Sequence, residues 1–375
     1  MVPINISDNL ETEKGILHLQ TDYRPGESYA VATLFNQGQV LAREKYPVPE
    51  PADEDIIKKW TLKKHREAVE TISFIFKVDE KVRSMKHKKS LVSLGSLYLH
   101  WGFLREAIDV LESILQEHLD SVGVAGCLCE AYLRSGEPEK AITVLAPFFK
   151  MAPKAAFLWT KMGKVRLKLS QFKKAYDDFK RAIHISNEDS EAHLYMALCC
   201  LYMVQNQVIH EDISSAEEGM RRFSSHLVDG VKASAQLSRN DFEPLLQCLK
   251  KNDMQSAIAM MLDILRQVQM SEDPIFQHLF YLQFIYGTEN KNSSIPDKYI
   301  PKMKTLVQNY PNRPDLRMFL GMGYVVQCRD LYQRALNEFH TALRLQKDFR
   351  EYENQIEEAD KLGEHFFQFI KMLFR

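Results

Sequence analysis

Six cysteines are the first candidates for chemistry in this 375-residue chain, and two pairs of them are close in sequence, Cys127 with Cys129 and Cys199 with Cys200. Zinc sites use four ligands, and paired cysteines usually have two to four residues between them at a turn. Residues one or two apart on a helix point about 100° or 200° away from each other, so neither pair is placed to share one ion. We therefore expect reduced, buried thiols and no bound metal.

The twelve histidines form no H-E-x-x-H motif, and none has a second histidine four residues away. His193 lies where a repeat helix normally carries an apolar residue, and we expect it to be a packing histidine. The chain also lacks the glycine-rich and serine motifs that bind phosphates or dinucleotides or present a nucleophile. These absences predict that the protein is not an enzyme and needs no cofactor.

Charge in the chain is balanced, with 49 Lys and Arg against 50 Asp and Glu, so no overall field favours nucleic acid or an anionic membrane. The most basic runs cover residues 59–66 and 81–89. Acidic residues such as Glu67 and Glu70 are interleaved there, and aromatic residues for base stacking are few. We interpret these runs as a solvated helix face, and an RNA-binding adaptor is the weaker alternative.

The N-terminal residues lack the profile of a signal peptide, and no run approaches the roughly 18 apolar residues of a membrane span. The sequence therefore predicts a cytoplasmic protein with no membrane span.

A residue pattern that repeats every 34 residues predicts the elements that position these side chains, with units beginning at Lys88, Val122 and Ala156. Two positions in each unit are small, as needed where helix axes approach to about 8–10 Å. These positions hold Gly95, Cys129 and Gly163, and then Ala107, Ala141 and Ala175. Beside them lie large apolar residues, Leu94, Leu128 and Met162, and then Leu111, Leu145 and Phe179. Each unit is therefore predicted to be a pair of packed amphipathic helices.

The predicted turn between the two helices of a unit falls at Gly102, Gly136 and Ser170. Glycine favours this place because it adopts positive φ without strain. On these residues the segment resembles the tetratricopeptide repeat (TPR) family. The resemblance implies a right-handed α-solenoid whose first helices line a concave groove for a partner helix or peptide.

The fold class that we predict is mainly α, a TPR-type α-solenoid preceded by a small antiparallel β meander. Residues 1–52 are rich in β-forming residues between turn clusters, and we expect three strands there. The predicted organisation is a β-rich unit at 1–52, a capping helix at 53–87, a TPR superhelix at 88–345 with clear units at 88–121, 122–155, 156–189 and 316–349 and degenerate units at 190–315, and a C-terminal helix at 350–375.

The resemblance assigns the groove to one face of the first helix in each unit. The candidate groove residues are Ser96, Leu99, His100, Glu130, Leu133, Arg134, Thr160, Lys164, Leu167 and Lys168. The three leucines would provide apolar contacts, and Arg134, Lys164 and Lys168 would orient the partner. Of the residues with which TPR proteins clamp a chaperone's C-terminal carboxylate, only Lys161 is matched, so that ligand is disfavoured.

We therefore predict a non-catalytic scaffold or adaptor that binds a protein partner. The alternative is a structural oligomer that self-associates through the β unit and the C-terminal helix. Apolar residues are dense at the end of that helix and would be exposed. They are Phe366, Phe367, Phe369, Ile370, Leu373 and Phe374.

Overall fold

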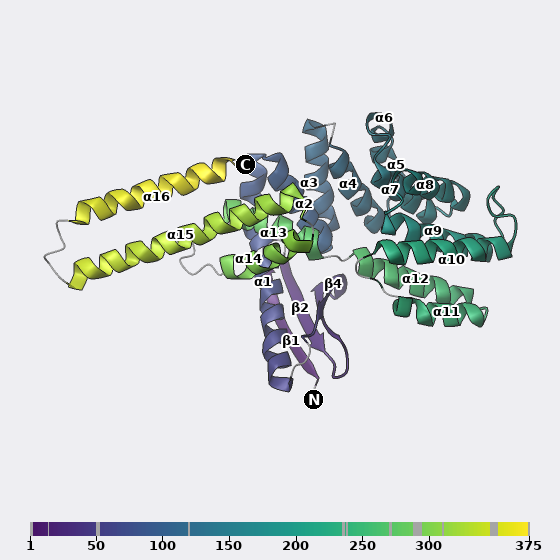
Figure 1. Ribbon diagram of the computed structural model, residues 1–375, viewed down its shortest axis with the longest axis horizontal. Coiled ribbons are helices and arrows are strands. Elements are labelled where there is room, and N and C mark those ends of the chain that lie inside the picture. The colour runs from purple at the N-terminus through teal and green to yellow at the C-terminus, as the bar shows by residue number, and fades with distance from the viewer. Residues whose placement is uncertain are drawn as a thin grey trace. The chain divides into compact units, whose positions relative to one another are not determined.

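The computed structural model shows an N-terminal sheet followed by helices, in two compact units (Figure 1). Unit 1 comprises Met1–Ser73 and Gly95–Glu272, and unit 2 comprises Phe74–Leu94 and Asp273–Arg375. The structure describes residues 3–13, 15–49, 53–118, 121–234, 237, 239–269, 272–287, 295–309, 311–345 and 352–373.

Unit 1 begins with an antiparallel sheet of four strands in the order β1-β2-β3-β4. The strands are β1 (Ile4–Thr12), β2 (Gly15–Tyr23), β3 (Tyr29–Asn36) and β4 (Gln39–Pro47). The predicted meander is therefore confirmed, but the expected count of three strands was wrong. The missed strand, β1, is an edge strand that buries a single side chain, Leu10, so its sequence has little apolar alternation.

The first half of α1 (Glu54–Met85) packs on one face of this sheet. Asp53 starts the helix because its side chain accepts a hydrogen bond from the Ile56 amide at 2.8 Å. His65 is buried against the sheet, with Nδ1 2.8 Å from Thr21 Oγ1 and Nε2 3.1 Å from Asp8 Oδ2. A sheet of this size gains the packing it needs from the helix.

Paired helices occupy the range in which the 34-residue pattern is clearest. The pairs are α2 (Lys88–His100) with α3 (Leu104–Glu117), α4 (Val122–Ser135) with α5 (Pro138–Leu145) and α6 (Phe148–Met151), and α7 (Ala156–Lys168) with α8 (Phe172–Ile185). A Cβ added to Gly163 would lie 2.5 Å from the Phe179 ring, and one added to Gly95 would lie 2.9 Å from Leu111. The small residues therefore permit the close approach of the two helices in these units.

Residues with positive φ form the turns inside these helix pairs. Gly102 has φ +77° and Gly136 has φ +83°. Ser170 takes the same backbone conformation, with φ 57°. The turn geometry is thus kept in the third pair, although serine adopts left-handed backbone at a cost.

The rest of unit 1 continues with α9 (Ser190–Gln205) and α10 (Ala216–Ala233), joined by a longer connection. A short 3₁₀ turn, η1 (Arg239–Phe242), leads into α11 (Glu243–Lys250) and α12 (Met254–Gln269). Asn252, with φ 56°, makes the turn between α11 and α12. Apolar side chains of α8 to α12 form one continuous core.

Unit 2 contains α13 (Glu272–Tyr286), α14 (Ile295–Asn309), α15 (Pro314–Leu345) and α16 (Glu353–Leu373). The predicted helix pair at 316–349 is wrong, because α15 is one continuous helix as far as Leu345. No glycine or proline stands between Gly323 and Ala335, so nothing ends the helix there.

The C-terminal helix predicted at 350–375 corresponds to α16, which runs beside α15 (Figure 1). Residues 346–351, 374 and 375 lie outside the described residues. Among the helices that the structure describes, none combines the length and the apolar character needed to cross a membrane.

Candidate partner-binding groove

Four charged side chains from three successive first helices meet on one face of unit 1, which we call the ion-pair face. Glu130 comes from α4, Lys161 and Lys164 from α7, and Glu191 from α9. The Oε2 atom of Glu130 is 2.8 Å from both lysine Nζ atoms, and Lys164 Nζ is 3.0 Å from Glu191 Oε1. Residues about one repeat apart in the chain therefore lie side by side on this face.

The four charges of the ion-pair face stabilise one another. Burial alone would raise the pKa of Glu130, but the adjacent Lys161 and Lys164 hold that pKa well below its ordinary value. The same balance lowers the pKa of Glu191 to about 2. Burial opposes the charge of Lys164, but Glu191 and Glu130 outweigh it and raise the pKa of that ammonium group. All four groups are charged near neutral pH, and their sum is zero.

Of the predicted groove residues, Glu130 and Lys164 come together directly on the ion-pair face. Thr160, one turn before Lys164, is buried, and its hydroxyl lies 3.1 Å from Asp189 Oδ2. Arg134 donates from Nη1 to the backbone carbonyl of Leu99 and so links α4 to α2. These contacts place three first helices, and the start of α9, in one continuous surface.

Two predicted groove residues are engaged elsewhere. His100 lies 3.7 Å, measured from Nε2, from Glu44 Oε1 on β4. Burial raises the pKa of Glu44, but the contacts with His100 outweigh it, so the net pKa is lowered. Ser96 is buried within the helix packing. Both side chains therefore contact other parts of this chain.

Leu99, Leu133 and Leu167 are all half-buried, and Leu167 packs against the core formed by α8 to α12. Lys168 is exposed and forms no ion pair with any residue that the structure describes. Sequence reasoning missed Lys161 and Glu191 as members of the ion-pair face. The available signal was a set of opposite charges 27, 31 and 34 residues apart.

The cysteines do not form a metal site among the described residues, and the helical divergence of Cys127 and Cys129 accounts for this. Burial raises the pKa of Cys129 to about 12 and that of Cys200 to about 12, so both are thiols near neutral pH. The expectation that all six are buried was wrong for Cys328, which is exposed on α15.

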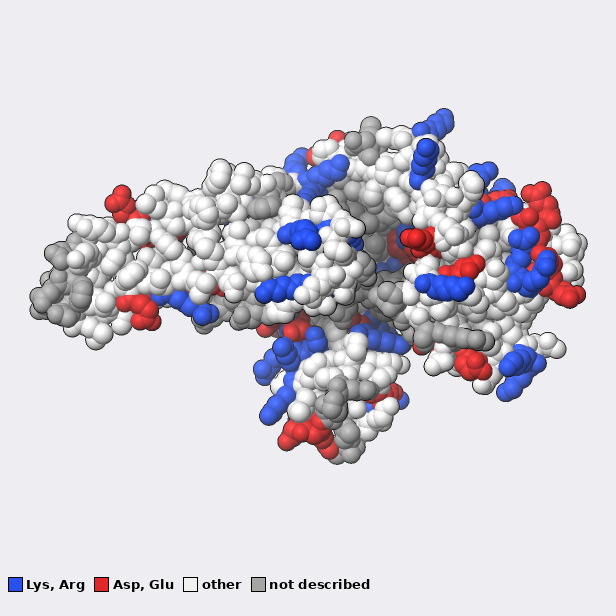
Figure 2. All heavy atoms as spheres, in the orientation of Figure 1, with Lys and Arg blue, Asp and Glu red and all other residues white. Residues whose placement is uncertain are grey.

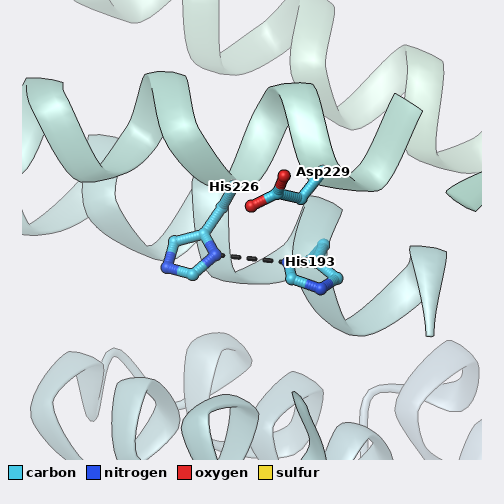
Figure 3. Close-up of side chains that lie close together, drawn as sticks. All are labelled: His193, His226 and Asp229. Atoms are coloured by element: carbon cyan, nitrogen blue, oxygen red, sulfur yellow. Dashed lines mark hydrogen bonds between the residues drawn. The ribbon is translucent and has the colours of Figure 1, made fainter. Parts of the chain in front are cut away.

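A second polar cluster lies between α9 and α10 and was not predicted (Figure 3). His193 Nδ1 faces His226 Nδ1 at 3.3 Å, and a carboxylate oxygen of Asp229 lies beside them. Burial, and next the neighbouring His193, lower the pKa of His226 to about 4. His193 was expected only to pack. The cluster escaped detection because His193 comes from a different helix than His226 and Asp229.

The basic run on α1 is partly neutralised by neighbouring acids. Lys64 pairs with Glu67 at 3.0 Å, and Arg83 pairs with Asp79 at 2.9 Å. Figure 2 shows basic and acidic side chains interleaved on the face in view, without a broad patch of one sign. These pairs favour the interpretation of a solvated helix face.

An apolar cavity of about 460 Å³ lies between α15 and α16. Its lining is almost wholly hydrophobic and includes Tyr332, Leu336, Phe339, Tyr352 and Ile356. Several large apolar side chains along both helices are exposed, and the surface of these two helices in Figure 2 carries few charged residues. The exposed residues include Leu331, Phe339, Leu362, Phe366, Phe369 and Leu373.

Comparison with known proteins places the fold in context. No family model and no curated protein sequence matches the chain. Among solved structures, the chain is similar to MamA, with 18% identity, a TM-score of 0.36, and coverage of 48% of this chain and 96% of that one.

Two further solved structures are similar over more of the chain. A tetratricopeptide repeat protein from Parabacteroides merdae shares 13% identity, with a TM-score of 0.34 and coverage of 74% and 98%. Human IFIT1, solved as a dimer with m7Gppp-AAAA, shares 15% identity, with a TM-score of 0.38 and coverage of 78% and 72%. The helix pairs, small contact residues and positive-φ turns described above give residues 88–185 a TPR-like fold, and the chain as a whole is mainly α-helical with an N-terminal β meander.

Proposed function

We propose that this protein is a non-catalytic scaffold that binds a helix or peptide of a partner protein along the ion-pair face of unit 1. The observation that carries the proposal is the alignment of α4, α7 and α9, which meet on one face through Glu130, Lys161, Lys164 and Glu191. A face built by successive repeats offers a partner regularly spaced contacts.

The chemistry of this face indicates the kind of partner. The four central charges are paired with one another, so they contribute no net field. The half-buried Leu99 and Leu133 offer apolar contacts, and the exposed ammonium group of Lys168 is available for a carboxylate. These features suit an amphipathic helix or extended peptide that places apolar residues on the leucines and an acidic residue near Lys168.

The test compares two variants of the full-length chain in a quantitative pull-down. Leu133→Ser with Lys168→Glu alters the proposed contacts, whereas Lys173→Glu with Ile185→Ser makes the same kinds of change on the second helix, α8. Circular dichroism first establishes that both variants are folded. We expect partners to be lost from the first variant and retained by the second. Equal retention by both variants would contradict the proposal.

A second candidate function is self-association through α15 and α16. The observation that favours it is the density of exposed apolar side chains on these helices beside the 460 Å³ cavity. Monomers seldom expose large contiguous apolar surfaces. We expect light scattering to give a mass above the 43.6 kDa of one chain, and Phe339→Glu with Phe369→Glu to return it to that value. A monomeric mass for the unchanged protein would exclude this function.

A further inference from the structure

We propose that His193, His226 and Asp229 form a binding site for a zinc ion between α9 and α10. Two imidazole nitrogens and one carboxylate are a donor set that zinc accepts, with water as the fourth ligand. One donor atom from each residue lies within 4.8 Å of the others. Figure 3 shows the two rings facing each other with the carboxylate beside them.

The separation of the two imidazoles matches zinc geometry. Nitrogens bound to one zinc ion at about 2.0–2.1 Å, at the tetrahedral angle, are about 3.3–3.4 Å apart. The Nδ1 atoms of His193 and His226 are 3.3 Å apart. The pair is therefore spaced as two ligands of one ion.

A contact outside the site orients the His193 ring. Its Nε2 lies 3.1 Å from the carbonyl oxygen of Asn187, and a carbonyl can only accept, so Nε2 carries the proton. The Nδ1 atom of neutral His193 then presents its lone pair toward His226. Metal-binding histidines in proteins commonly donate their other ring N–H to a carbonyl in this way.

The backbone brings the two helices close enough to share an ion. A Cβ on Gly230 would lie 2.8 Å from the Leu194 side chain and 3.3 Å from the Cβ of His193. Ser190 Oγ also donates to the Gly230 carbonyl at 2.8 Å. His226 and Asp229 are three residues apart on α10 and so lie on the same face of that helix.

Arg222, four residues before His226 on α10, is engaged by other groups. It donates from Nε to Glu218 Oε1 at 3.0 Å and to the Asp212 carbonyl at 2.8 Å. On zinc binding, the proton between the rings leaves His226 Nδ1 and His226 Nε2 takes up a proton, so His226 stays neutral and its Nδ1 lone pair is free for the ion.

The test is calorimetric titration of the metal-free full-length chain with zinc chloride. All proteins carry Cys328→Ser, because that thiol is exposed and would compete for zinc. We expect one zinc ion per chain. We further expect His226→Gln to weaken its affinity by at least ~100-fold, more than the 10–100-fold typical of losing an outer contact. The matched control is His184→Gln, which removes an exposed imidazole on α8 and should change nothing.

Asp229→Asn provides a second variant at a half-buried position, with an expected loss of ~10-fold or more. Cobalt bound in place of zinc should show the strong visible absorption of four-coordinate Co²⁺, and at equal cobalt concentration this absorption should disappear in His226→Gln and weaken in Asp229→Asn. No zinc binding by the parent protein would overturn the assignment and leave the 3.3 Å contact as a hydrogen bond between two histidines. Binding that is unchanged in both His226→Gln and Asp229→Asn would overturn it equally.

Discussion

Helix pairs α2 with α3 and α7 with α8, and the single helix α15, carry the same spacing of small residues but fold differently. Gly95 precedes Ala107 by the same interval that separates Gly163 from Ala175 and Gly323 from Ala335. In the first two cases the chain turns back between the small residues, and the glycine lies against a large side chain of the second helix, Leu111 or Phe179. In α15 the helix continues, and Leu331 and Phe339 stay exposed.

The residue at the turn accounts for this difference. Gly102 and Ser170 take positive φ between the paired helices, whereas Asp330 stands inside α15 without a neighbouring helix breaker. Small residues permit a close approach only after the chain has reversed direction. A repeat is thus defined by its turn as much as by its contact positions.

The largest expected effect is at Gly102, the turn between α2 and α3. A Cβ at Gly102 would lie 2.2 Å from the carbonyl oxygen of Leu41 on β4, and φ is +77° there. Gly102→Ala should destabilise unit 1 by at least about 3 kcal/mol, from overlap added to backbone strain. Gly136→Ala has the same strain and open space around it, so it should cost only about 1–2 kcal/mol. Urea unfolding measures both, and equal costs would contradict the role of Leu41.

A second prediction concerns the ion-pair face, which the paired helices of unit 1 build together. Glu130→Gln leaves Lys161 and Lys164 with Glu191 alone and should destabilise unit 1 by about 2–3 kcal/mol at neutral pH. Adding Lys161→Gln restores the balance of charge, so the double variant should be more stable than the single one. A double variant that is less stable by the sum of both single costs would show that these charges act independently.

The ion-pair face also makes the unfolding free energy of unit 1 depend on pH. The pKa of Glu191 is lowered to about 2 from an ordinary value of 4.5, and that of Glu130 is also lowered. A carboxyl group whose pKa is lowered by folding stabilises the folded state at pH values above its pKa in the unfolded chain. That stabilisation is lost as the pH falls from about 4.5 toward 2. Glu130→Gln should therefore flatten the loss of unfolding free energy in this window. Unfolding curves at pH 3 to 6 check it, and an unchanged slope would contradict the assignment.

The smallest expected changes in stability come from placing glycine at the two matched positions, Ser170 and Asp330. Ser170→Gly relieves serine from left-handed backbone and should stabilise unit 1 by about 0.5–1 kcal/mol. Asp330→Gly introduces glycine inside a helix and should destabilise α15 by a few tenths of a kcal/mol, about the difference in helix propensity. Hydrogen exchange of α8 and α15 reports each unit separately. Shifts of the same sign would mean that the two positions are equivalent after all.

The sequence predicted the helix pairs well because periodic small residues, apolar residues and turn glycines all indicated the same elements. It did not predict β1, because that strand is held mainly by backbone pairing with β2. It also did not predict that α15 is continuous, because the small residues fit a helix pair although no turn residue stands between them. Ser96 and His100 were assigned to a groove by family position, yet the sheet and the helix core take up their side chains.

The polar clusters show a second limit of reasoning along one helix. Lys161 joins Glu130 because first helices of successive repeats lie side by side, and His193 joins His226 because α10 packs on α9. Such pairs depend on the helix register between units, and local spacing does not report that register. Once the 34-residue register is known, residues about one repeat apart can be compared for complementary charge.

Site-specific photo-crosslinking in cells tests partner binding along the ion-pair face most directly. A photoreactive amino acid replaces Lys168, beside the ion-pair face, or Lys173, on the second helix of the same repeat. We predict that the protein labelled at residue 168 captures a discrete partner and that the protein labelled at residue 173 does not. Capture from residue 173 alone, or equal capture from both positions, would contradict binding along the ion-pair face.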